Sequence, residues 1–238
     1  MTLLDPRVLV GKARRSIRTR GWGGTLLEAL TRSKRSRARR MPRYVGELFF
    51  DLRNGTRVRG IVRFEKKGVF EQAFRCETTP RSWVGKALSE VTADSARYTF
   101  VDIGCGRGFV LLQALRRRYH RIVGIELAPQ IAAEARKNVE AYARRRGLAA
   151  GSVEVVAADA TTWELPCEPS VLYFANPFSR KIFETMIRRI EESLRRNPRE
   201  LYVVYTFPES RQVFDDSPSL ETVADRKRYV VYRSRAIV

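Results

Sequence analysis

An acidic residue and three glycines occupy alternate positions in the stretch Asp102-Ile103-Gly104-Cys105-Gly106-Arg107-Gly108. The mostly apolar run before it is typical of a strand, and the apolar run 109–115 after it is typical of the start of a helix. A strand that passes through a glycine turn into a helix directs backbone N–H groups and the positive helix end at a ligand. Glycine is needed where a Cβ atom would block a positive φ angle or the ligand's close approach. The stretch therefore indicates a nucleotide-binding turn; a tight turn without a ligand is the alternative.

The spacing of the glycines narrows the kind of nucleotide. A dinucleotide fingerprint, Gly-x-Gly-x-x-Gly, would place its third glycine where Phe109 stands. The pattern that is present, Asp-x-Gly-x-Gly-x-Gly, resembles motif I of the class I S-adenosylmethionine-dependent methyltransferases. The resemblance implies that the loop passes under the methionine part of S-adenosyl-L-methionine and that Asp102 orders the loop and contacts the amino group. The cofactor residues implied here are Asp102, Gly104, Cys105, Gly106 and Gly108.

Two further acids follow later apolar runs. Glu126 lies 22 residues beyond Gly104, the separation at which a carboxylate reaches both ribose hydroxyls in this architecture. Leu127, directly after it, is expected to form a wall for the adenine. In the resembling family an acid past the third strand accepts from the adenine amino group and the next N–H donates to the ring, which implies these roles for Asp159 and Ala160. A purely structural role for a loop acid is the alternative for Asp159.

The fourth apolar run ends in Asn176-Pro177-Phe178. This resembles the Asn-Pro-Pro-aromatic motif of amino methyltransferases, in which the Asn oxygen accepts from the substrate NH₂ and the aromatic ring packs on it. One proline of that motif is missing, so a planar amine as the substrate stays open. A bacterial group of methyltransferases of uncharacterised substrate carries a comparable Asn-Pro-Phe with a basic N-terminal segment, and this chain resembles that group.

A Thr-Pro step stands upstream of the glycine turn. Thr79 before Pro80 is an ordinary N-cap with proline at the first helical position, and that role is sufficient by itself. Many methyltransferases of the resembling type carry a similar step that helps to close over the cofactor's carboxylate. Thr79 is therefore a candidate cofactor contact.

The elements that must position these residues alternate between strand and helix patterns. Strands are expected at 98–103, 121–126, 153–158, 171–175 and 201–206, helices at 109–115, 130–146 and 179–196, and an antiparallel pair at 219–223 and 228–237. The fold class is α/β, a Rossmann-like class I methyltransferase sheet that is mostly parallel, with a C-terminal antiparallel hairpin and helices on both faces. Ligands of such sheets bind at the carboxyl ends of the strands, so Asp102, Glu126 and Asp159 can reach one molecule.

The net charge of the chain is unusually high. Lys and Arg number 46 against 26 Asp and Glu, giving a net charge of +20 and favouring a polyanionic or acidic partner such as RNA, DNA or acidic protein. Residues 1–43 hold 13 basic and two acidic residues, so this extension carries over half of the net charge. A membrane surface and a solvated helix are the alternatives for it. Three scattered cysteines and the lack of an apolar run near ~20 residues lead us to expect a cytoplasmic protein without a transmembrane segment.

We therefore predict three parts: a basic N-terminal extension (1–43), a small β-rich cap (44–75) with an Asn54-Gly55 hairpin turn, and the cofactor-binding domain (76–238). The expected activity is methyl transfer from S-adenosyl-L-methionine, leaving S-adenosyl-L-homocysteine, to an amine of a protein or nucleic acid, without a metal. Asn176, Pro177 and Phe178 would position the acceptor. A nucleic-acid-binding Rossmann-like protein without turnover and an NAD(P)-dependent reductase are the alternatives; the oligomeric state is open.

Overall fold

A computed structural model describes residues 48–58, 61–62, 76–77, 81–149, 151 and 153–235 of the chain. The chain divides into two compact units, Met1–Phe49 and Phe50–Val238. The sheet and the helices around it belong to the second unit.

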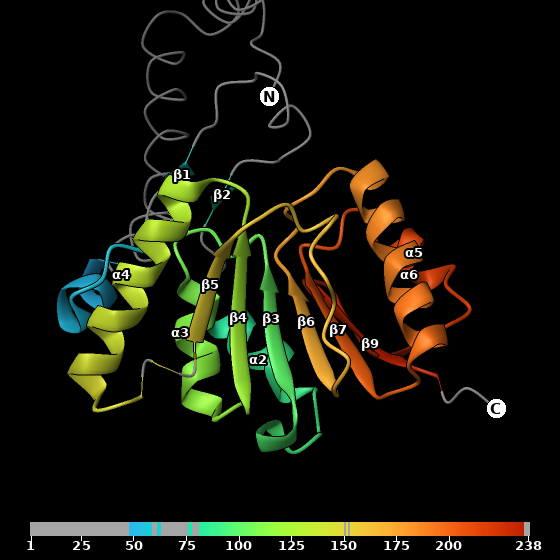
Figure 1. Ribbon diagram of the computed structural model, residues 1–238, viewed down its shortest axis with the longest axis horizontal. Helices are drawn as coiled ribbons and strands as arrows, with labels where there is room; N and C mark the ends of the chain where they lie inside the picture. The colour runs from blue at the N-terminus through green and yellow to red at the C-terminus, as the bar shows by residue number, and fades with distance from the viewer. Residues whose placement is uncertain are drawn as a thin grey trace, which may run out of the picture. The chain divides into compact units, whose positions relative to one another are not determined.

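Seven strands form one sheet in the order β5-β4-β3-β6-β7-β9-β8 (Figure 1). The strands are β3 (Thr99–Ile103), β4 (Arg121–Glu126), β5 (Val153–Ala157), β6 (Ser170–Phe174), β7 (Leu201–Thr206), β8 (Leu220–Arg226) and β9 (Tyr229–Ser234). The first five are parallel, whereas β9 runs antiparallel to both β7 and β8. The predicted Rossmann-like sheet with a C-terminal antiparallel hairpin is confirmed.

Helices cover both faces of this sheet (Figure 1). They are α2 (Arg81–Ser89), α3 (Phe109–Ala114), α4 (Pro129–Arg146), α5 (Arg180–Arg196) and α6 (Gln212–Asp215), with short 3₁₀ turns at Ser95–Arg97 and Leu115–Arg117. The first three helices contribute to one apolar cluster, and α5 and α6 contribute to the other. Alternation along the strands serves both clusters: Phe100 enters the first and Val101 the second.

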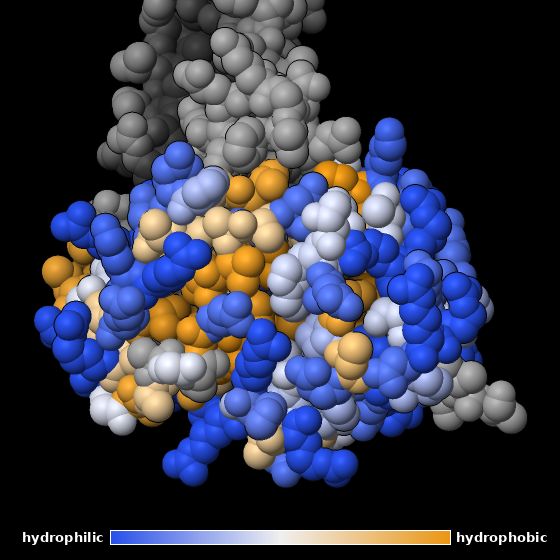
Figure 2. All heavy atoms as spheres, viewed as in Figure 1, coloured by the Kyte–Doolittle hydropathy of each residue, from blue (hydrophilic) through white to orange (hydrophobic). Residues whose placement is uncertain are grey.

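The central strands β3 and β6 are buried along their whole length, as expected of parallel strands covered on both faces. On the face turned to the viewer, apolar side chains gather over β4 and β5, and charged side chains dominate over α5 (Figure 2). The helix α5 owes its position to apolar residues three or four apart, among them Phe183, Ile187 and Ile190, which turn one face to the sheet. At α4, Pro129 occupies the first turn and Gly147, with φ +60°, ends the helix.

The predicted hairpin around Asn54-Gly55 is wrong over residues 48–54, which are helical. Gly55 has φ +66° and follows the helix as a C-terminal cap, with the Asn54 side chain donating to Phe50 O at 2.7 Å. Asp51 Oδ1 then accepts from Thr56 Oγ1 at 2.8 Å and from Val58 N at 3.0 Å. The ring of Phe50 packs on Phe109 at 5.4 Å between centroids and on Tyr142 at 6.1 Å, which fixes this helix against α3 and α4.

Beyond this segment, β1 (Ile61–Val62) and β2 (Cys76–Glu77) pair antiparallel as a separate two-stranded sheet. The extents of the basic extension and the cap stay predictions, since most of 1–80 lies outside the described residues. In the described part of the chain, no helix combines the length and the apolar character that crossing a membrane requires.

Candidate cofactor and acceptor site

The predicted site residues that the structure describes lie at one edge of the sheet. From β3 the chain moves outward to β4 and β5, and then returns to β6 on the other side of β3. The loops after β3 and β6 therefore leave neighbouring strands in opposite directions, which is where open α/β sheets bind ligands. These two loops are the glycine turn and the Asn176-Pro177-Phe178 segment.

The glycine turn requires its glycines for two separate reasons. Gly104, Gly106 and Gly108 have φ angles of +77°, +53° and +83°, in the left-handed region that side chains disfavour. At Gly104 a Cβ atom would also lie 2.7 Å from Pro177 Cβ, closer than two carbon atoms can approach. The turn is anchored to the next strand because Gly104 N and Cys105 N both donate to Ile125 O at 2.9 Å.

Asp102 is a buried carboxylate with one unused oxygen. Its side chain is 1% exposed, and Oδ2 has no hydrogen-bond partner within the described part of the structure. Burial, and secondarily the neighbouring Glu126 carboxylate, raise the pKa of Asp102 well above its ordinary value. A buried polar atom without a partner is costly, so it suits a site that a cationic or hydrogen-bonding ligand completes.

Glu126 connects the first two strand ends. Its Oε2 accepts from Gly106 N at 2.9 Å and its Oε1 accepts from Ala128 N at 3.0 Å. Burial raises the pKa of Glu126, and the backbone N–H groups of Ala128, Gly106 and Leu127 oppose this rise. A carboxylate has about four acceptor sites and these backbone N–H groups do not fill them all, so the ribose contact predicted for this residue is compatible with its structural role.

Cys105 and Leu127 follow the ends of β3 and β4, and their side chains differ in exposure. The Cys105 thiol is buried and donates to Gly106 O at 3.7 Å, and its Sγ would lie 2.9 Å from a Cβ atom at Gly124, so it packs inward against β4. Its N–H is bonded to Ile125 O and its carbonyl accepts from Gly108 N at 2.9 Å, so the second lone pair of that carbonyl, rather than the thiol, is the group available to a ligand. Leu127 is half-buried beside Glu126, as an adenine wall requires.

The third strand end carries Asp159 and Ala160. Asp159 Oδ1 accepts from Thr161 N at 2.8 Å and from Thr161 Oγ1 at 2.7 Å, and the Asp159 carbonyl accepts from Trp163 N at 3.0 Å. These bonds give the acid a structural role in its turn and hold its carboxylate in one orientation. Asp159 is half-buried and Ala160 is buried.

Asn176 is strained and held by a tyrosine that the sequence did not single out. Its φ angle is +51°, and its Oδ1 accepts from Tyr205 Oη at 2.6 Å. Tyr205 Oη in turn accepts from Ser210 N at 3.2 Å, so the hydroxyl proton is directed at Asn176. Burial raises the pKa of Tyr205 to about 12, which keeps that proton in place at neutral pH.

Phe178 is half-buried, and its ring packs on an aromatic cluster. Its ring lies 5.6 Å from the ring of Phe183 and 6.4 Å from that of Phe174, both edge-on. This packing fixes the end of the Asn176-Pro177-Phe178 segment against the start of α5. The segment is thus rigid at both ends, through Tyr205 and through Phe183.

Asn138 on α4 is a second residue that sequence patterns missed. Its Nδ2 donates to Arg107 O within the glycine turn at 3.0 Å, and its Oδ1 accepts from Arg57 N at 2.8 Å. The Arg107 side chain also pairs with Glu134 on the same helix at 2.6 Å. Asn138 is 5% exposed. Its position on the apolar face of the predicted helix is the one sequence signal that could have identified it, because an unpaired Asn is rarely buried.

Two further expectations concern the Thr79 contact and the absence of a metal. Thr79 lies outside the described residues, so its predicted contact stays a prediction. Over 81–149 and the other described ranges, no three His, Cys, Asp or Glu side chains gather as a metal ion would need.

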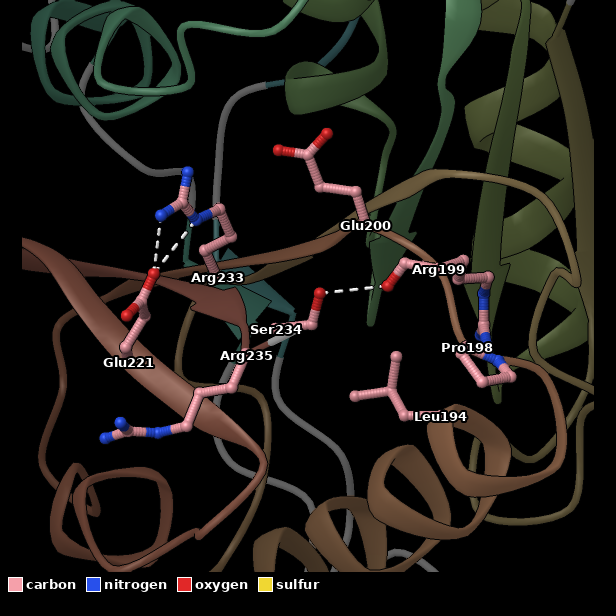
Figure 3. Close-up of a pocket in the computed structure, with 8 residues that line it drawn as sticks. All are labelled: Leu194, Pro198, Arg199, Glu200, Glu221, Arg233, Ser234 and Arg235. Atoms are coloured by element: carbon pink, nitrogen blue, oxygen red, sulfur yellow. Dashed lines mark hydrogen bonds and ion pairs between the residues drawn. The ribbon is translucent and has the colours of Figure 1, made fainter. Parts of the chain in front are cut away.

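A cavity of about 750 Å³ lies at the opposite edge of the sheet (Figure 3). It is close to the start of β7 and the end of β9, where Ser234 Oγ donates to Arg199 O at 2.9 Å and Arg233 pairs with Glu221 at 2.6 Å. None of the predicted site residues lines it. We place the functional site at the carboxyl edge instead, because the described residues of the predicted site lie there and the cavity lies at the start of β7.

Comparison with known proteins gives a match for part of the chain. Residues 100–197 match the sequence profile of a family described as "Methyltransferase domain". A search of curated proteins found no match.

Among solved structures, a predicted adenine-specific DNA methylase from Listeria monocytogenes is 13% identical, with 67% of this chain and 52% of that chain covered and a TM-score of 0.50. An RNA methyltransferase from Salinibacter ruber, in complex with S-adenosyl-L-homocysteine, is 23% identical, with 66% and 92% covered and a TM-score of 0.45. The profile match covers less than half of the chain, and the seven-stranded sheet is the mostly parallel Rossmann-like sheet that the sequence predicted.

Proposed function

We propose that this protein transfers the methyl group of S-adenosyl-L-methionine to an amine of a nucleic acid or a protein. The observation that carries the proposal is the placement of Asp102, with its unpartnered Oδ2, beside a glycine turn that touches Pro177. A cationic amino group and a methyl acceptor would thus be bound at adjacent points of one edge. The match to a methyltransferase domain supports this assignment.

The residues present fit the cofactor. Asp102 would accept from its amino group, the turn Gly104–Gly108 would lie under its methionine part, and Glu126 would accept from its ribose hydroxyls. Leu127, Asp159 and Ala160 would contact the adenine. When bound, the cofactor supplies an electrophilic sulfonium methyl group, so the protein's task is chiefly to bring the acceptor into line with it.

On the acceptor side, Asn176 would hold the amine. Its Oδ1 already accepts from Tyr205, and a second lone pair is available to a substrate N–H. The strained backbone of Asn176 and the bond from Tyr205 keep the amide in one orientation, which favours catalysis by orientation. Pro177 and Phe178 would form the wall of the pocket.

Equilibrium binding tests the cofactor assignment. Calorimetry is expected to show that the protein binds S-adenosyl-L-homocysteine and does not bind NADH, because the dinucleotide glycine spacing is absent at Phe109. Asp102→Ala and Glu126→Ala should both weaken the binding. Binding of NADH alone would favour a reductase, and binding of neither ligand would favour a Rossmann-like protein without turnover.

Tyr205→Phe is expected to lower methyl transfer by about fivefold while leaving the affinity for S-adenosyl-L-homocysteine unchanged. The substitution removes one hydrogen bond to Asn176, worth roughly 1 kcal/mol, and does not touch the glycine turn. The measurement is tritiated methyl incorporation into fractionated cell RNA and protein. Tyr202→Phe, at the other end of β7, removes a bond to Glu200 and is the matched control. Equal losses in both variants would contradict a positioning role for Tyr205.

A further inference from the structure

Positive charges lie beside the acceptor segment on both faces of the sheet. On one face, α5 begins directly after Phe178, and its first turn holds no acid but carries Arg180 and Lys181, both exposed. Cations at a helix N-terminus are locally unfavourable because they face the positive end of the helix dipole. Arg180 pairs with Glu184, whereas Lys181 has no such ion pair in the described part of the chain.

On the other face, the turn between β8 and β9 presents Lys227 and Arg228, both exposed. The guanidinium of Arg228 lies over the ring of Trp83 at 5.0 Å, and Trp83 packs on Phe207 at 5.1 Å. Phe207 N donates to Arg228 O at 3.0 Å, so both the backbone and the side chain of Arg228 are held. A guanidinium stacked on an aromatic ring has a defined direction that a free surface arginine lacks.

Contacts connect this stacked arginine to the acceptor segment. Phe207 follows β7, and Tyr205 two residues earlier donates to Asn176. We name Lys181, Lys227 and Arg228 the acceptor rim. Their charges are available, because among the described residues none of the three forms an ion pair, while nearby Arg211 and Arg226 pair with Asp225 and Glu90.

We propose that the acceptor rim binds the phosphates of a nucleic acid whose target base enters at Asn176. The proposal rests on the proposed function and narrows its acceptor to a nucleic acid. A polynucleotide carries phosphates on both sides of any one base, which matches cations on both sides of one pocket. A fixed guanidinium plane also suits phosphate oxygens and the face of an unstacked base. An acidic protein offers carboxylates without that regular arrangement around the reacting group.

The test uses the full chain with Lys181→Ala, Lys227→Ala and Arg228→Ala combined. The matched control combines Arg116→Ala, Arg144→Ala and Arg195→Ala, which removes the same charge at exposed positions near the helix ends of the opposite edge. The probe is a fluorescein-labelled single-stranded RNA, and its affinity is measured by anisotropy over a series of NaCl concentrations. Three lost phosphate contacts should reduce the slope of log affinity against log salt by about two for the rim variant and much less for the control.

Two accompanying measurements separate the possible failures. Calorimetry with S-adenosyl-L-homocysteine should give the wild-type affinity in both variants; failure of the wild-type protein to bind it would overturn the proposed function as a whole. Tritiated methyl incorporation into RNA should fall at least tenfold in the rim variant only. Equal slopes in rim and control variants, or incorporation into acidic protein that the rim variant retains, would overturn the rim proposal while leaving the cofactor assignment intact.

Discussion

Asp102→Asn is expected to weaken the binding of S-adenosyl-L-homocysteine by about 10- to 100-fold, because a hydrogen bond to a charged group contributes roughly 1.5–3 kcal/mol. The same substitution is expected to raise the melting temperature of the ligand-free protein by about 2–4 °C. The ligand-free fold bears the cost of a carboxylate that is 1% exposed and has an unpartnered Oδ2 in the described structure. An amide of the same shape cannot ionise, so it avoids the part of that cost that belongs to the ionised carboxylate. Calorimetry and thermal denaturation measure the two effects.

A substitution that lowers ligand affinity and raises the melting temperature identifies an acid that serves ligand binding; loss of an acid that supports the fold would lower the melting temperature. Asp94→Asn is the control, because Asp94 is exposed and caps a 3₁₀ turn with its side chain, which asparagine does equally well. This control should change neither quantity. A lower melting temperature for Asp102→Asn would mean that the carboxylate supports the fold and would contradict a binding role.

Because the pKa of Asp102 is raised, both the stability of the fold and the affinity for the ligand should depend on pH. Because the folded pKa lies above the unfolded one, the contribution of Asp102 to stability is greatest below the ordinary Asp pKa and is lost as pH rises through the raised value. A bound amino group favours the ionised carboxylate, so ligand binding releases the proton. Affinity for S-adenosyl-L-homocysteine should therefore increase with pH until the raised pKa is passed. Asp102→Asn should flatten this part of the profile.

Gly104→Ala is expected to lower the free energy of unfolding by about 2–4 kcal/mol and to weaken S-adenosyl-L-homocysteine binding by more than about 100-fold. The new Cβ atom would lie 2.7 Å from Pro177 Cβ, and the backbone has φ +77°. Relief of that contact must move either the glycine turn or the acceptor segment, so the site cannot keep its geometry. Urea denaturation and calorimetry provide the measurements.

The comparison is with Gly85→Ala in α2. A Cβ atom there has nothing within 4 Å and its φ is not positive, so the substitution should stabilise the helix by roughly 0.5–1 kcal/mol. S-adenosyl-L-homocysteine affinity should stay at the wild-type value. If Gly104→Ala behaved like Gly85→Ala, the close approach of the two loops would not be needed for binding.

The sheet and its glycine turn were predictable because their signals are local. Apolar runs such as 99–103 and 170–174 are buried along their whole length, and a glycine turn after the first of them can be recognised from the chain alone. The ends of α4 were equally clear from Pro129 and Gly147. Each of these features depends on neighbours in sequence.

The errors and omissions arise from contacts between distant residues. Asn54-Gly55 suits a hairpin turn and a helix end equally well, because glycine accepts the positive φ in either, and the contact of Phe50 with Phe109 and Tyr142 decides between them. Tyr205 could not be found because it lies 29 residues from the Asn176 amide that it orients. The anchoring of Gly106 by Glu126 was missed for the same reason.

The two hydrogen bonds of the Asn138 amide determine where this protein can be shortened. Its amide ties the carbonyl of Arg107 in the glycine turn to the backbone of Arg57, and the Phe50 ring rests on the first residue of α3. The segment 50–58 precedes the stretch that matches the methyltransferase profile, yet it buttresses the turn within that stretch. Trimming the chain to the profile would remove contacts that support the glycine turn of the proposed cofactor site. A deletion meant to remove the basic extension alone should therefore stop at residue 43.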